Sequence, residues 1–378
     1  MADYNLVDQL GSLTADQLAT ITFEAGVTAD DGIPGYGGLT STGTYWSYAD
    51  YSPHTWQTAL GTGTPVIYPN GITYSFDPSV SSAIFTPAIE NAMAQALAIW
   101  SDIANINFIY TSDFTSSTLG LAIVLAPTGG GTQETPLLDQ PTSTQGLLQT
   151  TAASIQLNLD PSLPYGDPSS YTIQGGYGVD ALVHESGHLL GLGHTGQYNA
   201  GDASDKTDYA TDELNAYDVR TWSIMSYINP TDKSATFYNF FNPSSTNWAT
   251  EAAEHGTVPY YPSVPYTRMG LDIFAAQRLY GAPTNGVLSG GQTFGFNSNI
   301  MYTAIDGSQQ LLSMYDFAPG YDNEPVVTLY DYGPDNTLAA PTATCPSARR
   351  HRPRSSGMSP SPNRMTTGLW RATGRNCR

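Results

Sequence analysis

The chain has 378 residues, enough for one large or two ordinary domains, and 40% of them are hydrophobic, which allows a buried core. It carries 33 acidic residues against 13 basic ones, and eight of the basic ones are arginines that follow residue 344. The remaining body is strongly acidic and repels phosphate backbones and anionic lipid headgroups, so we expect no nucleic acid or membrane partner. No apolar run approaches the roughly 18 residues of a membrane span.

Both cysteines, Cys345 and Cys377, lie in this basic tail. Their position excludes a disulfide framework, a cysteine nucleophile and a thiolate zinc site from the body. The first residues lack the basic and apolar regions of a conventional N-terminal signal peptide, so we expect an extracellular protein exported without one. Residues 1–60 are polar and rich in Gly, Thr and Tyr, and are predicted to be a loosely structured leader or a cleaved pro-segment; the sequence leaves this choice open.

Residues 72–76 alternate as a half-buried strand does. Thr86 then offers a helix N-cap with Pro87 at the first helical position. Apolar residues follow at helical spacing and predict one buried face, made of Ile89, Met93, Leu97 and Trp100. Further strands are expected at 106–110, 119–126 and 154–159, and further helices at 179–190 and 271–280, which end at Gly191 and Gly281.

The region from 181 to 194 reads ALVHESGHLLGLGH and contains three histidines. His184 and His188 lie four residues apart, so a helix projects both from one face, where they can share one zinc ion. His194 would lie about 15 Å from His184 along a continuous helix. We therefore expect the helix to break at Gly191, which accepts a positive φ, and the chain to bring His194 back to the metal.

Three neutral imidazoles leave a coordination position for water, which is typical of a catalytic zinc site rather than a structural one. Glu185 follows the first histidine by about 100° around the helix and flanks the metal. It is the candidate general base that takes a proton from zinc-activated water. These residues predict a zinc-dependent endopeptidase with protein or peptide substrates.

At these residues the sequence resembles the metzincin zinc peptidases, which carry the same long histidine motif. SIMSY at 223–227 resembles their methionine-containing turn, which implies that Met225 packs beneath the histidines. HTGQYNAG from His194 onward and LDIFAAQRLYG at 271–281 resemble the serralysin branch. That branch implies that Tyr227 is a further zinc ligand that swings to stabilise the oxyanion when substrate enters.

The sequence also departs from this family. Thr195 follows the third histidine where proline is usual, and we expect little effect. The calcium-binding Gly-Gly-x-Gly-x-Asp repeats are missing, although Asp316 and Asp322 lie where the first calcium loops begin. Calcium is therefore a second candidate cofactor beside zinc, with these two aspartates as its candidate ligands.

The expected architecture is α/β (α+β): a metzincin-type domain with a twisted, mostly parallel sheet and long helices, followed by a short β-rich segment. The leader at 1–60 precedes a catalytic domain at 61–285, the start of a truncated β-roll at 286–344, and the tail at 345–378. That tail is interpreted as a disordered basic arm or the product of a shifted reading frame. We expect a monomer. The alternatives are a zinc-binding protein without activity and a calcium-dependent surface module.

Overall fold

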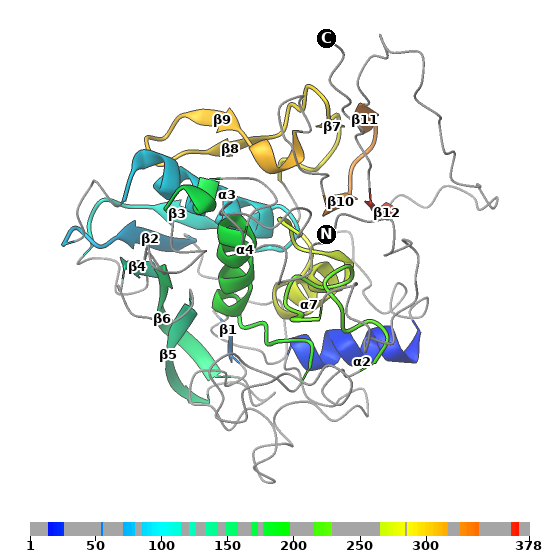
Figure 1. The fold of residues 1–378 in the computed structure, drawn as a ribbon, viewed down its shortest axis with the longest axis horizontal. Coiled ribbons are helices and arrows are strands. Elements are labelled where there is room, and N and C mark those ends of the chain that lie inside the picture. The colour runs from blue at the N-terminus through cyan, green and yellow to red at the C-terminus, as the bar shows by residue number, and fades with distance from the viewer. Residues whose placement is uncertain are drawn as a thin grey trace, which may run out of the picture.

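The computed structural model describes residues 14–25, 54–55, 71–79, 85–114, 121–125, 133–141, 148–157, 168–172, 177–196, 215–228, 265–283, 286–316, 326–339 and 364–369. These residues form a mixture of helices and strands, which confirms the coarse α/β expectation. In Figure 1 the largest sheet lies on the left, α4 (Tyr177–Leu189) crosses the centre, and α7 (Gly270–Tyr280) lies to its right.

The largest sheet contains five parallel strands in the spatial order β1-β6-β4-β2-β3. They are β1 (His54–Thr55), β2 (Ile72–Phe76), β3 (Phe108–Tyr110), β4 (Leu121–Leu125) and β6 (Leu148–Leu157). A sixth strand, β5 (Gln133–Pro141), pairs antiparallel with β6. The sequence predicted β2 with the observed bounds. The strands predicted at 106–110 and 119–126 are longer than β3 and β4, and the strand predicted at 154–159 overlaps only the second half of β6. Strand β5 was not predicted.

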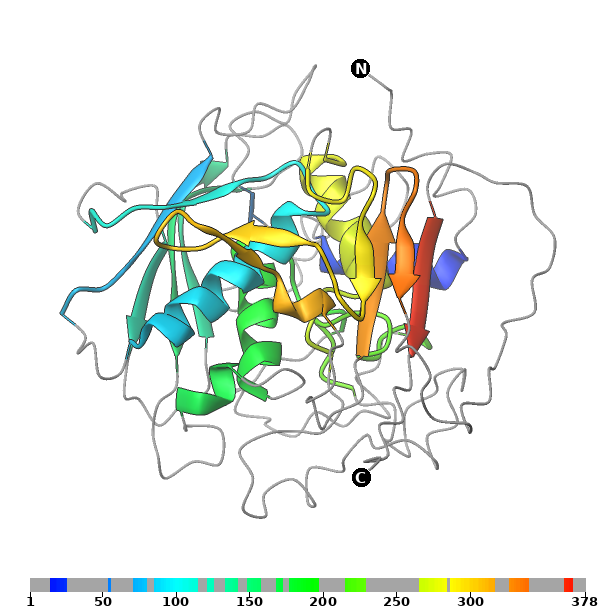
Figure 2. The same ribbon diagram turned by 90° about the horizontal axis from the view of Figure 1, so that it is seen from above.

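Helix α3 (Pro87–Ser101) begins as the sequence predicts, because the Thr86 hydroxyl accepts a hydrogen bond from the Ile89 amide at 3.4 Å. Its apolar face is buried. The helix packs against α4, and Figure 2 shows the two helices side by side from above. Trp100 is fully buried there and donates from Nε1 to the Val183 carbonyl on α4 at 3.1 Å. This contact joins the first long helix to the helix that carries two of the histidines. A short 3₁₀ helix, η3 (Pro168–Thr172), precedes α4.

The expected loosely structured leader is wrong for one segment, because α2 (Ala15–Glu24) is a helix that packs against α7 (Figure 1). Ile21, Glu24 and Ala25 at its C-terminal end are fully buried. The helix begins at Thr14, whose hydroxyl accepts from the Gln17 amide at 3.2 Å in an N-cap arrangement. The described part of the leader therefore belongs to the folded core.

Beyond residue 285 the chain forms short strands, as expected. β7 (Thr293–Gly295) pairs in parallel with β11 (Thr337–Ala339), and β8 (Met301–Thr303) forms a hairpin with β9 (Gln309–Leu311). A 3₁₀ turn, η5 (Ser313–Tyr315), follows. β10 (Val326–Asp331) pairs with β12 (Arg364–Leu369), so this part of the tail is a strand rather than a disordered arm. Among the described helices, none is long and apolar enough to cross a membrane.

Candidate metal centre

The reversal of the chain after α4 is built by a Schellman motif at Gly191. The Leu192 amide donates to the Gly187 carbonyl at 3.1 Å, and the Gly191 amide donates to the His188 carbonyl at 2.8 Å. These are the two hydrogen bonds that define this helix ending, and Gly191 has the positive φ, 94°, that the ending requires. The predicted break at Gly191 is therefore present, and the chain turns back toward α4.

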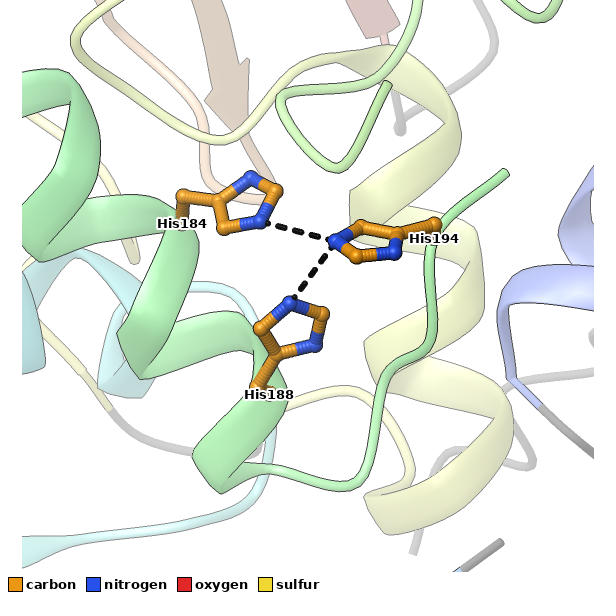
Figure 3. Close-up of side chains that lie close together, drawn as sticks. All are labelled: His184, His188 and His194. Atoms are coloured by element: carbon orange, nitrogen blue, oxygen red, sulfur yellow. Dashed lines mark hydrogen bonds between the residues drawn. The ribbon is translucent and has the colours of Figure 1, made fainter. Parts of the chain in front are cut away.

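The turn brings the three histidine rings together, as Figure 3 shows. The Nε2 atom of His194 lies 3.2 Å from Nε2 of His184 and 3.1 Å from Nε2 of His188. Bonds of about 2.0–2.1 Å to one tetrahedral zinc ion would place the ligand nitrogens about 3.3 Å apart. The ring nitrogens thus have the spacing of a zinc site, and they are the one such group of His, Cys, Asp or Glu among the described residues.

Backbone carbonyls determine which ring nitrogen of His184 and of His188 faces the metal site. The Nδ1 atom of His184 lies 2.9 Å from the Ile224 carbonyl, and that of His188 lies 2.8 Å from the Leu192 carbonyl. A carbonyl only accepts, so both Nδ1 atoms carry the proton and both Nε2 atoms present a lone pair. Nε2 of His194 carries at most one proton and cannot satisfy both lone pairs, whereas a cation satisfies all three.

Burial favours the neutral form of the two helical histidines. It lowers the pKa of His184 well below its ordinary value, and the neighbouring His188 lowers that pKa further. Burial also lowers the pKa of His188 to about 4. Metal binding requires neutral imidazole, so neither ligand needs to lose a proton near neutral pH before zinc binds.

Of the two predicted catalytic residues, Tyr227 contacts the histidine rings, and Glu185 is the neighbour of His184 in the sequence. Glu185 follows His184 on α4 and is buried, with 7% of its surface exposed. Tyr227 is half-buried; the centre of its ring lies 4.3 Å from that of His194, and it stacks on His184 at 5.7 Å. Met225 is fully buried with its sulfur against Gly187, so it lies beneath the turn of α4 that joins the two helical ligands.

A buried carboxylate that the sequence analysis missed holds the turn at 223–227. Asp272 on α7 accepts from the Ser223 hydroxyl at 2.5 Å and the Ile224 amide at 2.9 Å. Ile224 in turn supplies the carbonyl that orients His184. Asp272 is thus linked through Ile224 to the ligand His184. A single sequence offers no signal for this role, because an aspartate in the first turn of a helix usually serves the helix terminus.

The candidate calcium ligands are only partly described. Asp316 follows η5 and forms a bridge with Gly295, and its Oδ1 is buried without a hydrogen-bond partner. Asp322 lies outside the described residues. Near Gly290–Gln292 the amide side chains of Gln292 and Asn336 accept backbone N–H groups at 2.8 and 2.9 Å. Calcium binding stays a prediction.

Three convergent imidazoles in an HExxHxxGxxH pattern fit a metzincin-type zinc site. Comparison with known proteins shows that the chain is similar to metalloproteases named serralysin and AprA. It is 31% identical over 229 residues to Metalloprotease AprA of Pseudomonas entomophila, a match that covers 58% of this chain and 40% of that protein. It is 34% identical over 167 residues to Serralysin C of Dickeya chrysanthemi, covering 41% and 29%.

A third relative, Serralysin of Photorhabdus laumondii, is 30% identical over 234 residues, which cover 60% of this chain and 41% of that protein. The chain therefore spans about two fifths or less of the length of these relatives. No family model matches the chain.

Proposed function

We propose that this protein is a zinc-dependent endopeptidase with a metzincin-type catalytic domain. The observation that carries the proposal is the convergence of three buried imidazoles, with Nε2 of His194 3.2 Å from that of His184 and 3.1 Å from that of His188. The relatives named as metalloprotease and serralysin support the same chemistry. His184, His188 and His194 would hold the ion.

When bound, zinc lowers the pKa of a coordinated water toward about 7 and polarises the scissile carbonyl. In this proposal Glu185 accepts the proton of the attacking water and later donates it to the leaving amine; its position directly after His184 on α4 and its burial support this role. Tyr227 donates its hydroxyl proton in a hydrogen bond to the oxyanion, since its ring lies against two of the ligands. Met225 forms the apolar floor of the site.

The substrate in this proposal is an extended peptide. Strand β5 packs against α4 and, among the described residues, pairs only with β6. Its other edge is suited to receive a peptide as an additional strand through main-chain hydrogen bonds. This route would place the peptide over the helix that carries His184 and Glu185. Function as an extracellular monomer belongs to the same proposal.

Zinc analysis of the purified full chain, combined with a casein assay before and after chelation, tests the proposed function. We expect about one zinc per chain and an activity that the chelator removes and added zinc restores. Stoichiometric zinc without cleavage of casein or gelatin would leave a zinc-binding protein and overturn the enzymatic proposal. Stabilisation by calcium with no bound zinc would overturn the metal assignment as well.

A further inference from the structure

A second buried carboxylate, Asp218, connects two segments of the metal centre. Its Oδ1 atom accepts a hydrogen bond from the Thr195 hydroxyl at 2.6 Å and another from the Ser226 hydroxyl at 2.9 Å. All three side chains are fully buried. Hydrogen bonds to a buried carboxylate are among the stronger ones in proteins, so this junction is firmly held.

The two donors are the immediate neighbours of two site residues. Thr195 follows the third zinc ligand, His194, and Ser226 precedes Tyr227. The rings of His194 and Tyr227 form the closest ring pair that Tyr227 makes at the site, with centroids 4.3 Å apart. One oxygen of Asp218 therefore connects His194 with Tyr227. The connection runs through Thr195 on one side and Ser226 on the other.

The Ser226 side of the junction continues into the backbone. Ser226 Oγ also accepts from the Ile228 amide at 3.1 Å, and the Ile228 carbonyl accepts from the Arg220 amide at 2.9 Å. The serine proton is committed to Asp218, so the hydroxyl has no freedom to turn away. Tyr227 lies between two residues, Ser226 and Ile228, that are both fixed by this chain of hydrogen bonds.

We propose that Asp218 is a positioning residue that fixes the hydroxyl of Tyr227 relative to His194 and the bound metal. The inference rests on the proposed peptidase function and adds a residue to it. Thr195 is then a functional part of the junction rather than a neutral replacement for proline. Its side of the junction controls zinc affinity through His194, and the Ser226 side controls the chemical step through Tyr227.

The test uses the full chain with Asp218→Asn, Thr195→Val and Ser226→Ala. Asp102→Asn is the matched control, because Asp102 is also a buried carboxyl but lies at the end of α3. The zinc dissociation constant is measured by competition with a chromophoric chelator, and kcat and KM are measured on a peptide at saturating zinc. Replacing residues that orient metal ligands typically costs about 10- to 100-fold in affinity or activity, and we expect effects of that size.

The expected pattern separates the two sides. Thr195→Val weakens zinc binding, Ser226→Ala lowers kcat with little change in KM, and Asp218→Asn does both. In a Tyr227→Phe background Ser226→Ala should cost almost nothing further in kcat, because the hydroxyl that it positions is gone. Equal losses of kcat in both backgrounds would overturn the proposal. So would values of zinc affinity and kcat for Asp218→Asn that match those of Asp102→Asn.

Two further outcomes are informative. If Asp218→Asn does not fold, the two single-hydroxyl variants give the same readouts, and wild-type values in both overturn the proposal. If the wild-type chain binds zinc but cleaves nothing, the proposed function fails, while the zinc affinity of Thr195→Val still tests the junction. A tenfold or greater loss of affinity in that case supports the link between Asp218 and His194.

Discussion

At the level of single residues, the site depends on which ring nitrogen of each histidine faces the ion. Two backbone carbonyls fix the tautomers of His184 and His188, and both carbonyls come from turns rather than from regular elements. The sequence predicted the three ligands because their spacing follows helix geometry. It could not predict the carbonyls of Ile224 and Leu192 as hydrogen-bond acceptors, because every residue has a backbone carbonyl whatever its side chain.

The role of Glu185 gives the first prediction. Glu185→Gln should retain one zinc per chain, because the ligands are the three histidines, and should lose about 10²–10⁴ in kcat, the usual contribution of general acid–base catalysis. Metal analysis and steady-state kinetics on one peptide substrate measure both quantities. Near-normal turnover by the zinc-loaded variant would remove Glu185 from the mechanism.

Tyr227 gives the second prediction. Tyr227→Phe keeps the ring that stacks on His184 and removes only the hydroxyl. If that hydroxyl acts on the oxyanion, kcat should fall by about 10²–10³, the effect of losing one such donor, while KM changes little. A variant with unchanged kcat and raised KM would instead place the hydroxyl in substrate binding.

At the level of elements, the turn after α4 has two functions. It reverses the chain toward His194, and its Leu192 carbonyl orients His188. Both depend on the left-handed conformation of Gly191, which the sequence predicted from the need to bring the third histidine back. The exact turn type was not predictable from the glycine alone, because it is defined by hydrogen bonds to Gly187 and His188.

Gly191→Ala is the third prediction. A Cβ in the left-handed region costs about 1–2 kcal/mol, and relaxation of the turn should also displace the Leu192 carbonyl and His194. We expect a lower Tm and weaker zinc binding. The matched control is Gly307→Ala, an exposed glycine at φ 81° with no atom near the added Cβ. The control should lose comparable stability and keep its zinc affinity, and equal zinc affinity in both variants would refute the argument.

Strand β5 and helix α2 were not predicted for the same physical reason: both depend on contacts with other elements rather than on local sequence signals. Strand β5 contains Pro136 and Pro141 and takes its conformation from pairing with β6, so local preference argued against it. Helix α2 is short and carries threonines, and it is stabilised by packing against α7, which is distant in the sequence. In contrast, β2, α3 and α7 carry their signals locally: alternation, an N-cap with proline, and a terminal glycine. Gly281 ends α7 with φ 77° as that signal predicts.

At the level of the whole molecule, the N-terminal helix is joined to the metal centre. The Glu24 carbonyl accepts from the Gly193 amide at 2.7 Å, next to the third ligand. Its side chain is fully buried beside Asp272, and burial raises the pKa of Glu24 well above its ordinary value, with the Asp272 charge raising it further. Burial raises the pKa of Asp272 too, but the hydrogen bonds from Ile224 and Ser223 lower it, so we expect Glu24 to hold the proton of this pair.

Proton linkage at Glu24 is the last prediction. A carboxyl whose folded pKa is raised contributes its full stability below its unfolded pKa, about 4.5, and loses it as pH rises toward the folded value. Glutamine copies the protonated acid and does not titrate. The Tm difference between Glu24→Gln and the wild type should therefore shift in favour of the variant as pH rises from 5 to 8.

The comparison must be made between variants of the metal-free protein, because His184 and His188 act in the opposite direction. Their lowered pKa values make the folded state lose stability as pH falls below about 6.5, in wild type and variant alike. The difference in Tm cancels this contribution and isolates Glu24. Glu90→Gln is the control, since Glu90 is only partly buried and should show a smaller change with pH. A Tm difference for Glu24→Gln that stays constant from pH 5 to 8 would mean that Glu24 is ionised in the folded protein. A buried cation beside Glu24 would then be needed to balance its charge.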